Sequence, residues 1–117
     1  RGRGGHILHA SDYYSSNGQV EWLMAQGEKM AAIGGHAGIR DTSELMVVHS
    51  QGVRENWRQN FPPARAAKLG LNGDPSRASV DRGRRLLHLK TQAAINQVRQ
   101  FLSSRQLRSA KEWSEGE

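Results

Sequence analysis

The most regular hydrophobic pattern lies in the last third of the chain. From Ser79 onward, apolar and small residues recur along one stripe at helical spacing, while most arginines and glutamines lie off it. This spacing predicts one long amphipathic helix. Beyond Arg105 the periodicity is lost, so we expect residues 106–117 to form a fraying tail. The stripe consists of Gly83, Leu87, Ala94, Val98, Phe101 and Leu102.

The N-terminal region predicts one strand and one short helix. Residues 6–14 (HILHASDYY) combine apolar and aromatic residues and change abruptly to Ser-Ser-Asn-Gly, which is typical of a strand that runs into a turn. Residues 19–26 (QVEWLMAQ) are rich in apolar residues, with Asn17 available as a cap and Gly27 as a stop. We therefore expect a short helix there.

A glycine-rich stretch separates this helix from the next. Three glycines fall within five positions of residues 33–40 (IGGHAGIR), so we expect a loop whose backbone can approach a ligand closely. Asp41, followed three residues later by Glu44, resembles a capping box, which predicts a helix from about Thr42.

The following segment has no clear period. Residues 51–73, with Phe-Pro-Pro at positions 61–63, predict a long surface connection, and residues 74–76 (DPS) predict a turn. One strand, several helices, a glycine loop and a closing helix together predict an α/β unit with helices packed on a sheet. A stable sheet needs about three strands or more. Either further strands lie in the irregular segment, or another segment supplies them.

Composition and charge narrow the class of protein. A chain of 117 residues is of the size of one domain, and the absence of cysteine fits a reducing cytoplasm. The net charge of +6 raises nucleic acid as a partner, but the arginines are scattered without interleaved aromatic residues, so we consider it an unfavoured alternative. The apolar stretch after the basic first residues, Ile7-Leu8, is too short for a signal peptide or a membrane span.

Candidate chemistry centres on His36. This histidine lies in the glycine loop and precedes Asp41 and Glu44, so the three side chains could converge at a helix N-terminus. A neutral histidine can move a proton near pH 7, and free N–H groups at a helix start can polarise a carbonyl. On these residues alone, however, Asp41 as a simple helix cap with Glu44 as its partner is the commoner arrangement.

The other histidines receive no role. His6 and His9 are an odd number apart in the expected strand and would point to opposite faces. His49 and His88 stand alone in helical stretches. The chain contains neither the G-x-S-x-G elbow of serine hydrolases nor a phosphate-binding loop with the Walker lysine.

Two motifs resemble the creatininase family of amidohydrolases. Residues 35–46 (GHAGIRDTSELM) resemble the family motif His-Ala/Gly-Gly-x-x-Glu-Thr-Ser. Residues 72–79 (NGDPSRAS) and 83–87 (GRRLL) look like the family's Gly-Asp-Pro turn and C-terminal helix. The order and spacing are similar, and the resemblance covers residues 6–105, which correspond to the second half of a family member.

The resemblance implies a fold, an activity and site residues. Family members are three-layer αβα enzymes, commonly oligomeric, whose two Zn or Mn ions activate water to hydrolyse an amide. His36 matches the catalytic histidine that moves a proton from metal-bound water to the leaving nitrogen. Asp41 replaces the family's glutamate and is expected to orient that histidine or its loop. The neighbours Gly35, Ala37 and Gly38 are expected in the substrate pocket.

The metal ligands of the family lie mainly in motifs that this sequence lacks, Glu-x-His-Gly and Asn-Gly-His-Gly-Gly-Asn. We therefore assign no metal ligand here and expect residues 1–117 to form a single partial domain that is inactive alone. Its expected partners are a small-molecule amide and either further copies of itself or a complementary N-terminal half. The alternative is a non-catalytic remnant that serves only in oligomerisation.

Overall fold

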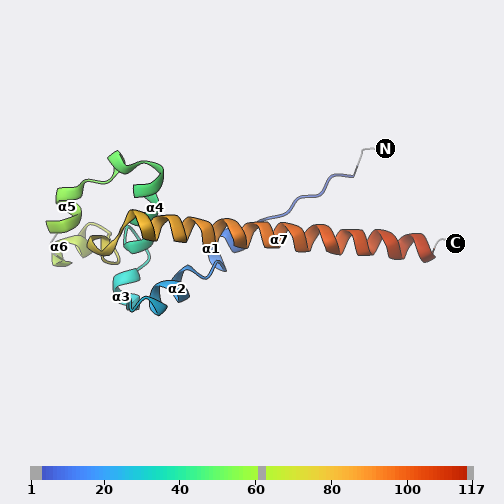
Figure 1. The fold of residues 1–117 in the computed structure, drawn as a ribbon, viewed down its shortest axis with the longest axis horizontal. Helices are drawn as coiled ribbons and strands as arrows, with labels where there is room; N and C mark the ends of the chain where they lie inside the picture. Colours follow the sequence, from blue (N-terminus) through green and yellow to red (C-terminus); the bar gives the residue numbers. More distant parts are fainter. Residues whose placement is uncertain (1–3, 61–62, 116–117) are drawn as a thin grey trace. The chain divides into compact units, whose positions relative to one another are not determined.

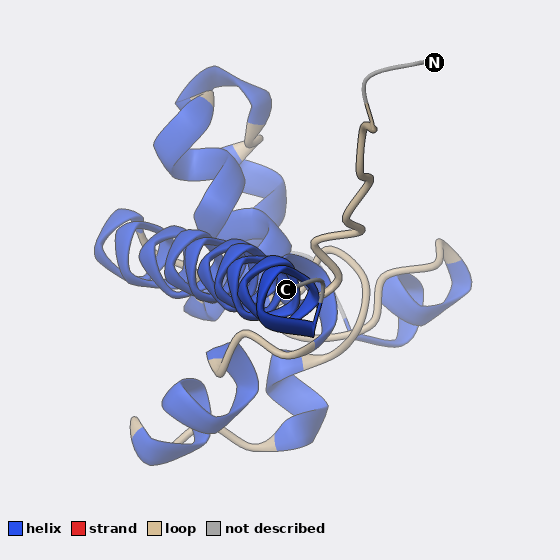
Figure 2. Ribbon diagram, turned by 90° about the vertical axis from the view of Figure 1, so that its right-hand side faces the viewer, coloured by secondary structure: helices blue, strands red, loops and turns tan. Residues whose placement is uncertain are grey.

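The computed structural model describes residues 4–60 and 63–115. Three segments lie outside it: residues 1–3, Phe61 and Pro62 of the expected surface connection, and the last two residues of the expected tail. Within the described ranges the secondary structure is helical and contains no strand, as Figure 2 shows. The predicted α/β architecture, including the three-layer αβα fold that the resemblance implies, is therefore wrong. The only β-type pairing in these ranges is an isolated antiparallel bridge between His36 and Asn72.

The helices follow one another with short connections (Figure 1). Contacts divide the chain into two units, one comprising residues 18–89 and the other residues 1–17 together with 90–117. The α-helices are α1 (Asp12–Ser15), α2 (Gln19–Ala25), α3 (Met30–Ile33), α4 (Ile39–Val48), α5 (Glu55–Asn60), α6 (Pro63–Lys68) and α7 (Val80–Glu115), and the 3₁₀ helices are η1 (Ser50–Gly52) and η2 (Pro75–Arg77).

A small apolar core holds residues 18–89 together. Leu23 of α2, Ile33 of α3, Ile39 of α4 and Leu86 of α7 are fully buried against one another. Apart from α7, the helices of this unit have at most ten residues, a length that is marginal for an isolated helix in water. The stability of α2, α3 and α4 therefore depends on the apolar side chains that they contribute to this core.

A buried glutamine joins three of these helices. The Gln19 side chain is 1% exposed, and its Nε2 donates to the Leu86 carbonyl oxygen at 3.0 Å and to Glu44 Oε1 at 2.5 Å. A buried amide is tolerated only when it has such partners. Glu44 is thereby directed toward α2, so the capping box predicted for Asp41 and Glu44 is wrong.

The backbones of helices α4 and α7 come into contact at Gly83. A Cβ atom at this position would collide with the carbonyl group of Ser43. The Ser43 side chain is fully buried, and its Oγ accepts a hydrogen bond from the Ser79 backbone N–H at 3.1 Å. Position 83 of the predicted stripe is therefore a glycine because the backbones of the two helices are in contact there.

The N-terminal segment is not a strand, contrary to its prediction. Residues 6–10 have no regular structure, and α1 follows them. Gln97 satisfies backbone groups here, because its Oε1 accepts from the Asp12 N–H at 2.9 Å and its Nε2 donates to the His9 carbonyl at 3.4 Å. The Lys90 ammonium also lies 5.1 Å from the centroid of the Tyr13 ring. The Gln97 side chain thus forms hydrogen bonds to the backbone that a neighbouring strand would otherwise form.

The remaining predicted elements have mixed outcomes. The helix predicted at residues 19–26 is confirmed as α2, and the turn at 74–76 is confirmed by η2, where Asp74 Oδ1 accepts from the Ser76 N–H at 3.0 Å. Helix α4 starts at Ile39, three residues before the predicted start. The segment 51–73 is less irregular than predicted because it contains α5 and α6.

The long C-terminal helix is confirmed as α7, but it continues to Glu115. Residues 106–115, which we expected to lose the helical period and fray, are part of this helix. These residues (QLRSAKEWSE) lack a repeated apolar stripe, but they include several good helix formers whose propensity does not depend on one.

We expect Gly83→Ala to lower the free energy of unfolding by about 2 kcal/mol. Overpacking costs on the order of 1–3 kcal/mol, and the gain in helix propensity of up to about 1 kcal/mol recovers only part of it. Urea denaturation followed by circular dichroism measures the change. Gln92→Ala, at an exposed position of the same helix, serves as the control and should cost nothing. Equal stability of Gly83→Ala and the parent chain would contradict the close α4–α7 contact.

Candidate functional site

The glycine loop before α4 lies against the backbone of residues 72–74. Gly34 has φ of +60° and ψ of −172°, a combination that L-residues with side chains rarely adopt, and a Cβ there would collide with the Asn72 carbonyl. A Cβ at Gly73, whose φ is +129°, would lie 2.8 Å from the Gly38 Cα. The glycines thus allow close approach, as predicted for this loop, but the approaching group is another part of the backbone.

His36 is held in this loop by its main chain. Its N–H donates to the Asn72 carbonyl at 3.1 Å, and the Asn72 N–H donates to the His36 carbonyl at 2.9 Å. The preceding N–H, that of Gly35, donates to Asn72 Oδ1 at 2.7 Å. The imidazole is exposed, and none of residues 4–60 and 63–115 forms a hydrogen bond with it. The backbone of His36 is therefore fixed, while its side chain is available to solvent or to a ligand.

Asp41 stabilises the same loop from the start of α4. Its Oδ2 accepts a hydrogen bond from the Ala37 N–H at 3.0 Å, and Thr42 Oγ1 donates to the Ala37 carbonyl at 3.0 Å. Ala37 has a φ of +53°, a left-handed conformation that costs an alanine about 1 kcal/mol or more. These two side chains offset that cost and also place a carboxylate at the helix N-terminus, where it is favourable.

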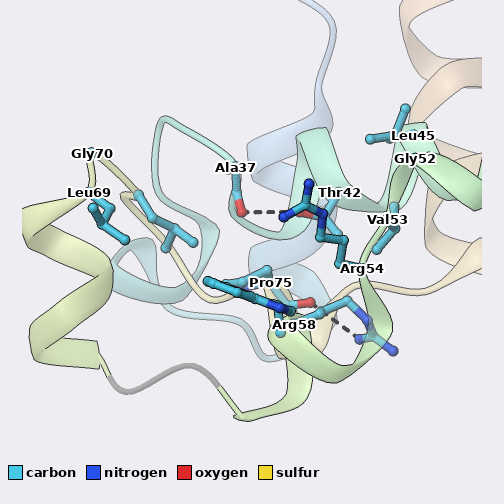
Figure 3. A pocket seen from close by; sticks show the side chains of 12 residues that line it. Ala37, Thr42, Leu45, Gly52, Val53, Arg54, Arg58, Leu69, Gly70 and Pro75 are labelled. Carbon is cyan, nitrogen blue, oxygen red and sulfur yellow. Dashed lines mark hydrogen bonds between the residues drawn. The ribbon is translucent and has the colours of Figure 1, made fainter.

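A cleft of about 400 Å³ opens beside the loop. Ala37 and Thr42 line it (Figure 3), whereas Gly35 and Gly38, which were also predicted in a pocket, do not. Most of its lining is apolar. The lining residues are Ala37, Thr42, Leu45, Gly52, Val53, Arg54, Trp57, Arg58, Leu69, Gly70, Leu71 and Pro75.

Arg58 forms part of the cleft wall, and structural contacts take up most of its donors. Its Nη1 donates to the carbonyls of Pro75, Ser76 and Ala78 at 3.3, 3.0 and 3.2 Å. Its other nitrogens bond to Glu55, with Nε to Oε2 at 2.9 Å. Arg58 thus ties α5 to the segment around η2. The sequence analysis did not identify it, although a turn at 74–76 leaves carbonyls that need a donor.

Glu28 carries the most deeply buried charge among the described residues. It is 5% exposed, with Oε2 2.6 Å from Arg77 Nε and Oε1 2.7 Å from Arg82 Nη2. The hydrogen bond from Arg77 lowers the pKa of Glu28 below its ordinary value, and Arg82 adds to this effect, while burial opposes it. This carboxylate joins the α2–α3 connection to η2 and α7. Sequence reasoning missed it because its partners lie about fifty residues away.

The described residues do not fit the metal centre that the family resemblance implies. In residues 4–60 and 63–115, no three His, Cys, Asp or Glu side chains come together in a way that could hold a metal ion. His36 and Asp41 stay predicted site residues. We derive no chemical step through a metal.

Comparison of the chain with protein-family models, with curated proteins and with solved structures found no match. Among the described helices, none is both long and apolar enough to cross a membrane.

We expect Asp41→Ala to increase the hydrogen-exchange rate of the Ala37 amide and to lower the free energy of unfolding by about 1 kcal/mol. The reason is the loss of an acceptor and of a favourable charge at a helix start. NMR-detected exchange and urea denaturation measure the two effects. Asp41→Asn, which keeps an acceptor oxygen, should retain most of the protection at Ala37. Unchanged exchange in Asp41→Ala would show that Asp41 does not hold the loop.

We expect Glu28→Gln to cost about 2 kcal/mol near neutral pH, because hydrogen bonds to a charged group are lost. The pKa of Glu28 is lowered on folding, so its stabilisation is present above the unfolded pKa of about 4.3 and is lost as pH falls through the lower folded value. The difference between the parent chain and Glu28→Gln should therefore shrink below about pH 4.

Urea unfolding at pH 7, 5 and 3 measures this difference. Glu21→Gln, which changes an exposed carboxylate of α2, is the matched control and should have little effect at any of these pH values. A difference for Glu28→Gln that stays constant down to pH 3 would mean that the charge of Glu28 contributes nothing.

Proposed function

We propose that this chain forms part of a metal-dependent hydrolase that cleaves the C–N bond of a small-molecule amide, in the manner of the creatininase family. In this proposal His36 is the proton-transfer residue, and the metal ligands lie in a segment that this sequence does not contain. The partner is a complementary segment, which also completes the substrate pocket. The absence of cysteine favours a reducing cytoplasm as its location.

The observation that carries the proposal is the joining of two distant motifs. The stretches that resemble the family, residues 35–46 and 72–87, contact each other in three places. His36 pairs with Asn72, Gly38 lies against Gly73, and Ser43 of α4 is hydrogen-bonded to Ser79 just before α7. Motifs that are separate in sequence thus build one structural frame around the histidine.

The geometry suits a residue that transfers a proton. The imidazole of His36 is exposed on a loop whose main chain is fixed on both sides, so the ring can turn toward a reacting group without moving the backbone. Asp41 contributes by holding the adjacent Ala37 peptide rather than by bonding to the ring. The cleft that Ala37 borders lies next to the histidine loop and offers a place for substrate.

The proposal predicts no turnover by the chain alone and turnover when the missing segment is added. The test mixes the purified chain with a fragment that carries the Glu-x-His-Gly and Asn-Gly-His-Gly-Gly-Asn motifs of a creatininase-type enzyme, in Zn²⁺ or Mn²⁺. Ammonia or amine release from a panel of small amides is the readout. In the mixture, His36→Ala should lower the rate by about 10²–10⁴-fold, the usual contribution of a general acid–base residue.

His88→Ala, at an exposed position of α7, is the matched control and should leave the rate unchanged. Metal-dependent hydrolysis by the chain alone would contradict the proposal. A stable complex, seen by native mass spectrometry, without turnover on the panel would instead favour the alternative of a non-catalytic assembly module.

A further inference from the structure

The cleft beside the histidine loop carries charge of one sign. Its walls are mainly apolar, with Leu45, Val53, Leu69 and Leu71 among them, and its charged lining residues are both arginines. No Asp or Glu belongs to the lining. A ligand that enters the cleft therefore meets apolar surface and positive charge, since Glu55, which pairs with Arg58, is not among the lining residues.

The two arginines differ in how far their guanidinium groups are available to a ligand. Arg58 already pairs with Glu55 and donates to three carbonyls, so a carboxylate offsets its charge and most of its donors are taken. Arg54 is exposed, and within the described ranges no carboxylate lies within salt-bridge distance of it. Figure 3 shows the Arg54 side chain extending toward Ala37 and Thr42. Its guanidinium is the available cation of this cleft.

An aromatic ring lies beside that cation. The Arg54 guanidinium carbon is 6.0 Å from the centroid of the Trp57 ring, at the outer limit of a cation–π contact. Trp57 is 52% exposed and lines the same cleft. Exposed tryptophan is costly in water, so an apolar ligand that covers this ring gains from burial of both surfaces.

We propose that this cleft binds a small monocarboxylate with an apolar or aromatic body. The body lies against Trp57 and the leucines, and the carboxylate accepts the paired N–H groups of Arg54, whose fork matches carboxylate geometry. A volume of about 400 Å³ is within the usual range for small-molecule sites. The net charge of +6 adds a general attraction for anions.

This inference goes beyond the proposed function and does not depend on it. Binding requires only the cleft of residues 37–75, without metal, complementary segment or turnover. The chain alone can therefore be tested for binding, and a failure of the hydrolysis assay leaves the result of this test unaffected.

The test uses three probes with the same aromatic body and different charge: 3-phenylpropionate, 3-phenylpropanamide and 3-phenylpropylamine. Each is titrated into ¹⁵N-labelled chain, and the indole N–H signal of Trp57, assigned with Trp57→Phe, reports binding. We expect the carboxylate to bind about fivefold more tightly than the amide, as one partly exposed ion pair would give, and the amine to bind most weakly. The signal of Trp22, outside the cleft, should not shift.

Arg54→Gln should remove the advantage of the carboxylate over the amide while leaving amide binding unchanged. Arg85→Gln, at an exposed position of α7 outside the cleft, makes the same change in net charge and should preserve the fivefold ratio. Equal affinity for carboxylate and amide in the parent chain, equal effects of the two arginine variants, or no shift at Trp57 would each overturn the proposal.

Discussion

The structure of residues 18–89 depends on a contact between two stretches of backbone. The loop before α4 lies so close to residues 72–74 that neither Gly34 nor Gly73 leaves space for a Cβ atom, and at Gly38 the Ile33 carbonyl takes up that space. Reciprocal hydrogen bonds between His36 and Asn72 hold the two stretches together. This contact places the histidine, sets the direction in which α4 leaves the loop and forms the edge of the cleft at Ala37.

Polar side chains carry much of the remaining organisation because the apolar core is small. Glu28 binds two arginines, one from η2 and one from α7. Arg58 donates hydrogen bonds to three carbonyls around η2. Gln19 joins α2 to α4 and α7. Part of the positive charge of the chain is therefore structural. Buried groups of this kind also define the arrangement sharply, since an alternative packing would leave them without partners.

The same frame serves both proposals in different ways. The proposed hydrolase function uses the exposed ring of His36, whose support comes from the main chain of Asn72 and from Asp41 through Ala37. The proposed carboxylate site uses Arg54 and Trp57 on the α5 side of the adjoining cleft. In the glycine loop, His36 is followed directly by Ala37, which lines the cleft. The proposed proton-transfer residue is therefore next in sequence to a residue of the proposed binding cavity.

The sequence by itself determined the elements whose signals are local. The period of α7 from Ser79, the apolar content of α2 and the Asp-Pro turn that begins η2 are properties of neighbouring residues, and each appears where it was predicted. Tertiary structure alone decided which segments meet. Residues 6–14 show a strand pattern but find the side chain of Gln97 instead of a partner strand. The glycine loop faces Asn72 rather than a ligand, and Glu44 binds Gln19 rather than capping α4. Such choices depend on contacts between residues far apart in the chain, and the free energy of those contacts outweighs local propensity.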